Sequence, residues 1–118
     1  MIARIWRGVT KEPKAEEFFS YMLKTGVKGL RATEGNLGVL VLRHVNREHV
    51  EFLLISLWKS FDAIRRFAGD NIDKAVYYPE DKKYLIALEP KVVHYEVLVG
   101  PKQFVSDHET ASDSAAGI

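Results

Sequence analysis

The chain has 118 residues, of which 47% are hydrophobic, and its 17 basic and 16 acidic residues leave a net charge of +1. This size and composition predict one domain with one core, and the balanced charge, with no basic patch, excludes a nucleic-acid-binding footprint. The absence of cysteine excludes disulfides and thiol chemistry, and the absence of a signal-peptide pattern and of a long apolar stretch predicts a cytoplasmic protein that does not enter a membrane.

The chain begins with a loosely alternating segment of β-forming residues, 2–9, which predicts a strand. Glu12 and Pro13 then favour a helix start, because the first helical turn has no use for the N–H that proline lacks. Apolar residues follow at helical spacing until Gly26, and a short extra turn is expected through Ala32.

The middle of the chain predicts a hairpin and a second helix. Two strand-like segments, 39–45 and 50–58, are separated by a short turn at 46–48. After them, the hydroxyl of Ser60 can cap a helix that Gly69 ends.

The last part of the chain predicts one more helix and one more strand. Acidic residues in a first turn indicate a helix over 79–88, and 92–99 is the fourth strand. The order β-α-β-β-α-β predicts an α+β protein with a ferredoxin-like fold and an antiparallel sheet. We expect residues 1–100 to form this domain and the polar segment 101–118 to be a disordered tail.

The predicted strand at 50–58 is apolar on both faces. Alternation places Leu54 and Trp58 on one face, and Leu53, Ile55 and Leu57 on the other. Both helices of such a chain cover the same face of the sheet, so the second apolar face needs another partner. The sequence therefore predicts a homodimer in which sheet packs on sheet.

Three aromatic residues are candidates for a site. Trp58 ends a central strand beside a loop, where pockets form, although a tryptophan that fills core volume is the simpler interpretation. Tyr77 and Tyr78 are adjacent, so at most one of them faces a cavity. A buried phenol can donate or accept a proton, which makes Tyr77 a candidate proton partner; a hydrogen-bonded rim residue is the alternative.

Two histidines are candidate bases. His94 lies on the last predicted strand, where Arg4 of the neighbouring first strand can approach it, and a polar cross-strand pair is the alternative. His44 flanks the hairpin turn, where a solvated surface residue is the usual finding. No two histidines stand at a metal-ligand spacing, so the sequence predicts no metal site.

Three segments carry a family resemblance: the opening strand MIARIWRGVT, the strand Phe52–Trp58 with Lys59 and Ser60 after it, and the segment YYPEDKKYLIALEP leading into HYEV. Over roughly residues 1–99 the chain resembles the antibiotic biosynthesis monooxygenase family of dimeric α/β barrels. The resemblance implies a pocket between helices and sheet, and either cofactor-free oxygenation of polycyclic phenols or breakdown of heme.

The same resemblance implies site residues. Trp58 matches the strand-end tryptophan of the polycyclic oxygenases, while their asparagine and tyrosine fall on Leu54 and Ile64. In the heme-degrading members, the catalytic asparagine falls near Ile5 and the tryptophan on Phe67. The implied substrate-binding residues are Ile5, Leu54, Trp58, Ile64 and Phe67.

The heme-ligating histidine of those members falls on Tyr77, so their catalytic triad is absent and heme is not the favoured cofactor. The chain also lacks a phosphate loop, a nucleophile elbow and a zinc signature. The leading hypothesis is a cofactor-independent monooxygenase that acts on a small aromatic or quinol-like compound and dioxygen, with Trp58, Tyr77 and His94 as catalytic candidates. The alternatives are a non-catalytic dimeric small-molecule-binding protein and a heme-binding protein without the triad.

Overall fold

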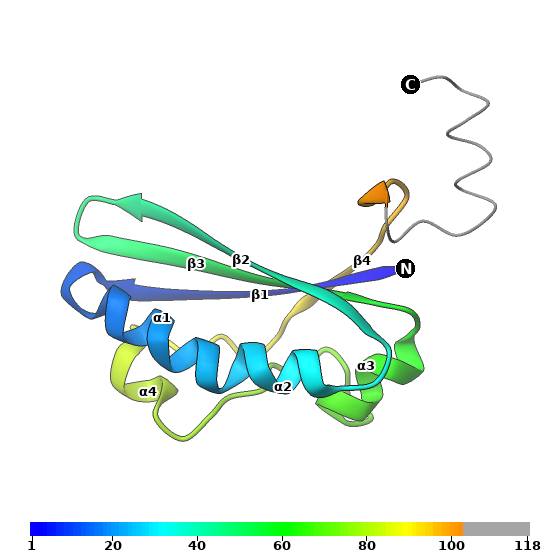
Figure 1. Ribbon diagram of the computed structural model, residues 1–118. Helices are drawn as coiled ribbons and strands as arrows, with labels where there is room; N and C mark the ends of the chain where they lie inside the picture. Colours follow the sequence, from blue (N-terminus) through cyan, green and yellow to red (C-terminus); the bar gives the residue numbers. More distant parts are fainter. Residues whose placement is uncertain (103–118) are drawn as a thin grey trace.

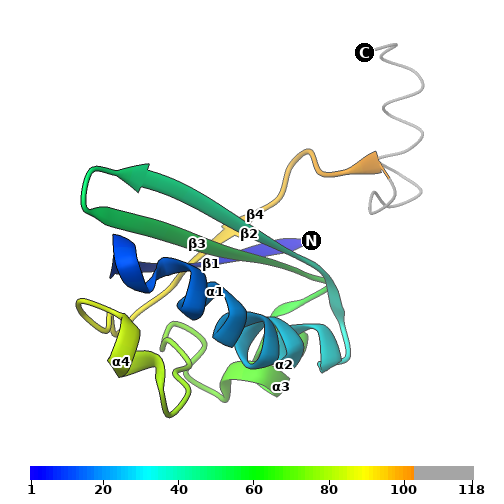
Figure 2. The ribbon, with the colours of Figure 1, turned by 60° about the vertical axis from the view of Figure 1, so that its left-hand side comes forward.

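The computed structural model describes residues 1–102, so the predicted tail lies outside the described residues except for its first two positions. One antiparallel sheet has a layer of helices on one face, as Figures 1 and 2 show. No helix within the described range is long and apolar enough to cross a membrane. The elements are β1 (Ile2–Lys11), the 3-10 turn η1 (Glu12–Lys14), α1 (Ala15–Lys24), α2 (Gly26–Ala32), β2 (Asn36–Asn46), β3 (His49–Trp58), α3 (Phe61–Ala68), α4 (Asp81–Tyr84) and β4 (Val93–Glu96).

The strand order is β2-β3-β1-β4, and every neighbouring pair is antiparallel. This is the ferredoxin-like arrangement that the element order predicts. The expected ends of α3 are also confirmed, since the Ser60 hydroxyl accepts a hydrogen bond from the Ala63 N–H at 3.2 Å and Gly69 follows the helix with φ of 84°.

Two predicted elements are shorter than expected, and β1 sets the end of each. The predicted helix over 79–88 is only the four residues of α4. Beyond it the chain becomes extended, and the Ile86 N–H donates to the Val9 carbonyl at 2.9 Å. The predicted strand over 92–99 ends at Glu96, which pairs with Ile2 at the beginning of β1. Beyond α4, hydrogen bonding to the free edge of β1 is therefore more favourable than continuing the helix.

The two faces of β3 carry the residues that its alternation predicts, and in the isolated chain these faces are buried to different degrees. Phe52, Leu54 and Trp58 are buried under the helices and belong to the hydrophobic core of residues 1–102. Leu53 and Ile55 point to the other face and are only half-buried in the isolated chain.

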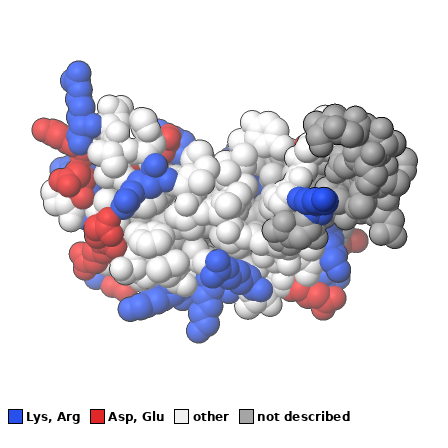
Figure 3. Space-filling view, turned by 45° about the horizontal axis from the view of Figure 1, so that its top comes forward, with Lys and Arg blue, Asp and Glu red and all other residues white. Residues whose placement is uncertain are grey.

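That other face, which we call the open face, carries an apolar row across all four strands. The register pairs Val93 with Ile5, Ile5 with Ile55, and Ile55 with Leu40. Leu40 is 50% exposed and Val93 is 52% exposed. Figure 3 shows the visible part of this face as largely uncharged in the middle, with Lys, Arg, Asp and Glu side chains gathered towards its margin.

Candidate ligand-binding cavity

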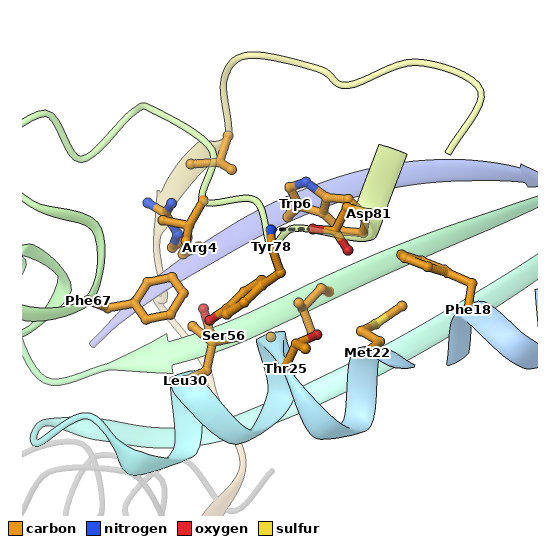
Figure 4. A pocket seen from close by; sticks show the side chains of 14 residues that line it. Arg4, Trp6, Phe18, Met22, Thr25, Leu30, Ser56, Phe67, Tyr78 and Asp81 are labelled. Atoms are coloured by element: carbon orange, nitrogen blue, oxygen red, sulfur yellow. Dashed lines mark hydrogen bonds between the residues drawn. The ribbon is translucent and has the colours of Figure 1, made fainter. Parts of the chain in front are cut away.

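A cavity lies between the helices and the helix-facing side of the sheet (Figure 4). About 40 Å³ of it is open to the centre of a water molecule. At roughly 10–15 Å³ per water by this measure, it holds about three waters as it stands. Its apolar wall includes Trp6, Phe18, Met22, Leu30, Leu54 and Phe67.

The indole of Trp6 forms part of this wall because Gly8 leaves room for it. A Cβ atom at Gly8 would lie 2.1 Å from the Trp6 ring, so a side chain at that position would displace the ring. The indole N–H of Trp6 donates to the Tyr77 hydroxyl at 3.3 Å, and its ring centroid lies 6.3 Å from that of Phe18. β1 thus fixes one aromatic surface of the cavity.

Arg4 brings a buried positive charge to one end of the cavity. Its side chain is 3% exposed, and its guanidinium lies 5.7 Å from the centroid of the Phe67 ring. It donates to the carbonyls of Ile72 and Lys74, the latter at 3.0 Å, which ties the segment after α3 to the sheet. Burial lowers the pKa of Arg4 to about 10, against an opposing effect of the Asp73 carboxylate. Arg4 therefore stays charged at neutral pH.

Tyr78 lines the cavity, and its ring lies in the middle of the side chains drawn in Figure 4. Its ring lies over two glycines of α2, since an added Cβ would approach the Tyr78 ring to 3.9 Å at Gly26 and its hydroxyl to 2.5 Å at Gly29. Burial raises the pKa of the Tyr78 phenol, so the hydroxyl is protonated at neutral pH. The two glycines form a slot for a planar ring.

Asp81 is the acidic group of the cavity and lies on the other side of Tyr78 from Arg4 in Figure 4. One of its carboxylate oxygens accepts a hydrogen bond from the Tyr78 N–H at 2.7 Å. Burial raises the pKa of Asp81, although this hydrogen bond opposes the shift. A carboxylate made more basic by an apolar environment is suited to accept a proton.

The structure brings only two of the residues implied by the family resemblance into the cavity wall. Leu54 and Phe67 line it. Trp58 and Ile64 are fully buried in the core beside it, and the Trp58 indole N–H donates to the Ser56 hydroxyl at 2.8 Å. Ile5 points to the open face, because it pairs with Ile55.

The predicted acid–base candidates lie outside the wall. The Tyr77 hydroxyl donates to the Glu89 carbonyl at 2.5 Å, and Tyr78 is the tyrosine that faces the cavity. His94 lies behind Arg4, with its Nε2 atom 3.1 Å from the Arg4 guanidinium, as the cross-strand alternative predicts. His44 is exposed on β2 and pairs with Glu51, on the opposite face of the sheet from the cavity.

The position of the His94 proton follows from its neighbours. Arginine only donates, so Nε2 must accept and the proton of the neutral ring belongs on Nδ1, which lies 3.3 Å from the Asp73 carboxylate. Burial, and then the charge of Arg4, lower the pKa of His94, while Asp73 opposes them. In residues 1–102 no group of three His, Asp or Glu side chains is arranged to hold a metal ion.

Folding stability should therefore fall as the pH falls below the ordinary histidine value of 6.5. The folded state disfavours the imidazolium of His94, whereas the unfolded chain takes up a proton at this histidine near pH 6.5. The free energy of unfolding therefore decreases as the pH falls through this range, and this site causes no decrease at higher pH. His94→Gln should flatten the decline in urea midpoint between pH 7.5 and 5.5. An equal decline in both proteins would contradict the assignment.

Sequence reasoning missed Arg4, Ser56 and Asp81 as cavity residues. The signal for Arg4 was present, because Ile2, Arg4 and Trp6 alternate and so share one face of the first strand. A charged residue at an inward-facing position is unusual and points to a special role. No comparable pattern precedes Asp81, which follows an irregular segment.

No family model and no curated protein match the chain. Solved structures that share its fold include two at 16% sequence identity. One is a crystal structure of a MhuD variant with two manganese protoporphyrin IX molecules bound per active site, which gives a TM-score of 0.54 over 86% of this chain and 98% of that one. The other is the heme-degrader MhuD from Mycobacterium tuberculosis with two hemes bound in its active site, which gives a TM-score of 0.53 over 86% and 99%. The chain therefore shares the α+β ferredoxin-like fold of these two structures.

Proposed function

We propose that the chain is a homodimeric monooxygenase of the antibiotic biosynthesis monooxygenase type, which binds a small planar aromatic compound between helices and sheet and needs no cofactor. One observation carries the proposal: an aromatic-walled cavity holds a carboxylate with a raised pKa, Asp81, and a buried cation, Arg4. Apolar walls would place an aromatic ring, and the two charged groups would act on its acidic proton and on the resulting anion.

The proposed reaction uses the substrate as its own reductant. Asp81 takes a proton from a phenol, quinol or activated ring carbon, and the anion transfers electrons to dioxygen. One oxygen atom is retained at the ring carbon and the other leaves as water, so an anthrone yields a quinone. Arg4 stabilises the anion, and the apolar wall keeps bulk water away from it.

Ligand size is limited by Tyr78. Because the open space holds about three waters, a ligand must displace the Tyr78 ring from its slot. The slot that this movement opens accepts one ring of similar size, and the open space beside it extends the limit to a compound of a few fused rings. This favours small aromatic compounds.

Heme does not fit the cavity as it stands. The open space is far below the roughly 300–1,000 Å³ typical of cofactor sites, and no histidine lines it in the described part of the chain. The phenol of Tyr78 is directed against Gly29, not towards an open position where iron could bind. The proposed reaction therefore has no step through heme.

The oxygenase proposal is tested by oxygen uptake with anthrone, in the absence of flavin and metal. We expect protein-dependent uptake of one dioxygen per anthrone, with anthraquinone as product. Asp81→Asn keeps an acceptor for the Tyr78 N–H but removes the base, and should slow the reaction about 10²- to 10⁴-fold. Glu80→Gln is the matched control, since Glu80 is the adjacent, exposed acid. Ligand binding without any turnover would instead support a non-catalytic binding protein.

Removing the Tyr78 ring should convert the slot into an open site. Tyr78→Ala is expected to lower the free energy of unfolding by about 2–4 kcal/mol, because it leaves a cavity under α2. Added phenol should restore part of the loss in the variant, measured as a rise in melting temperature that the parent protein does not show. Phenol that raises both melting temperatures equally would contradict a slot occupied by Tyr78.

A further inference from the structure

We infer that Arg4 and Ser56 form an anion subsite at one end of the cavity, and that the ligand is an aromatic compound bearing a carboxylate. The inference rests on the proposed function only in requiring that the cavity binds an aromatic ligand; it does not depend on the oxygenase reaction. It is supported by the burial of Arg4, by the unused hydrogen-bond donors of Arg4 and Ser56, and by the apolar side chains of the cavity wall around them.

Arg4 is a buried charge without a partner of opposite charge. Within residues 1–102 no carboxylate oxygen lies within 4.0 Å of its guanidinium, although its side chain is 3% exposed. The acidic group that affects it most is Asp73, which is itself exposed and lies against the Nδ1 atom of His94. Buried arginines are normally paired, so the missing anion is the feature to be explained.

The Arg4 guanidinium has unused N–H donors, and its hydrogen bonds hold it in a fixed position. It carries five N–H groups, and its three hydrogen bonds go to the carbonyls of Ile72 and Lys74 and to His94. Two N–H groups therefore have no acceptor in the described part of the chain. The carbonyls fix the plane of the guanidinium before any ligand arrives, which lowers the entropic cost of binding.

Ser56 adds a hydroxyl donor next to Arg4. The two residues are directly opposite each other in the β1–β3 ladder, so their side chains lie side by side on the cavity face. The Ser56 oxygen accepts the Trp58 indole N–H at 2.8 Å, which leaves its own hydrogen to donate. Within residues 1–102 that hydrogen has no acceptor either.

A carboxylate is the anion that this set of groups favours. Its two oxygens match parallel N–H groups of a guanidinium, and its negative charge would be paired with Arg4. A phosphate dianion would bring a second negative charge into an apolar cavity that already contains the Asp81 carboxylate. Phe67 packs against the guanidinium, and Trp6 and Leu54 continue the wall, so the body of the ligand is aromatic.

The test compares 2-naphthoate with its uncharged isostere 2-naphthamide by calorimetry. We expect the full chain to bind naphthoate at least 10-fold more tightly. Arg4→Met should abolish this preference and leave amide binding, whereas Arg43→Met, which removes an exposed arginine on β2, should preserve it. Arg4→Lys keeps the positive charge but cannot form the paired hydrogen bonds of a guanidinium. It should retain a reduced preference for naphthoate over the amide, and it still provides a test if Arg4→Met does not fold.

The outcomes of this test distinguish failure of the anion subsite from failure of the whole cavity as an aromatic site. Equal binding of acid and amide by the parent protein would overturn the anion subsite and leave the aromatic site intact. Binding of neither compound would count against the cavity as an aromatic site, and with it the subsite. Protoporphyrin IX and its dimethyl ester form a second pair: a preference for the acid in this pair alone would overturn the small aromatic ligand in favour of a porphyrin carboxylate.

Discussion

Replacing Trp58 with alanine is expected to lower the free energy of unfolding by about 3–5 kcal/mol. The side chain is 0% exposed, its ring centroid lies 6.2 Å from that of Phe67, and its N–H donates to Ser56. Alanine would therefore leave a cavity and deprive the Ser56 hydroxyl of its donor. Loss of ligand binding should follow from this loss of support, because Trp58 does not line the cavity.

Urea unfolding at a fixed protein concentration measures the effect, since dimerisation would make the apparent stability depend on concentration. His44→Ala, at an exposed position on β2, is the control and should change stability by no more than about 0.5 kcal/mol. A loss below about 1 kcal/mol for Trp58→Ala would contradict the packing described for the end of β3.

Replacing Leu40 with glutamate is expected to convert a dimer into a folded monomer. Leu40 is 50% exposed in the isolated chain, so glutamate costs the monomer little. In the proposed dimer the same side chain is buried against the partner's sheet, as the end of the row that runs from Val93 through Ile5 and Ile55. An unpaired carboxylate there would cost several kcal/mol.

Light scattering checks this prediction directly. The parent protein should show twice the chain mass of 13.4 kDa at micromolar concentration, and Leu40→Glu should show 13.4 kDa with unchanged circular dichroism. Leu23→Glu is the matched control, because Leu23 is 44% exposed but lies on α1, on the other side of the sheet. A monomeric parent protein, or equal dissociation by both variants, would refute sheet-on-sheet packing.

The fold was predictable where apolar residues recur at the spacing of a strand or of a helix. The alternation around Leu54 and Ile55 predicts both faces of β3, and the turn chemistry of Ser60 and Gly69 predicts the ends of α3. The length of the helix at 79–88 was not predictable, because the edge of β1 competes for the backbone of Ile86, and that competition is visible only in three dimensions.

The cavity was less predictable, because it depends on irregular segments. Adjacency showed that only one of Tyr77 and Tyr78 can face a cavity, but nothing in the sequence says which. Gly26 and Gly29 form the slot for the Tyr78 ring, whereas the Tyr77 hydroxyl donates to the Glu89 carbonyl outside the cavity. Residues distant in sequence therefore decide which tyrosine enters the site.

The central claim is that an aromatic compound binds between the helices and the sheet, in the place that Tyr78 now fills. The most direct measurement is a titration of the protein with 2-naphthol, followed by amide and indole N–H signals in nuclear magnetic resonance spectra. We predict a saturable shift of the Trp6 indole signal and of the Gly29 and Tyr78 amides, with the Leu40 amide unaffected. Shifts that centre on Leu40 and the open face, or that do not saturate, would contradict the account.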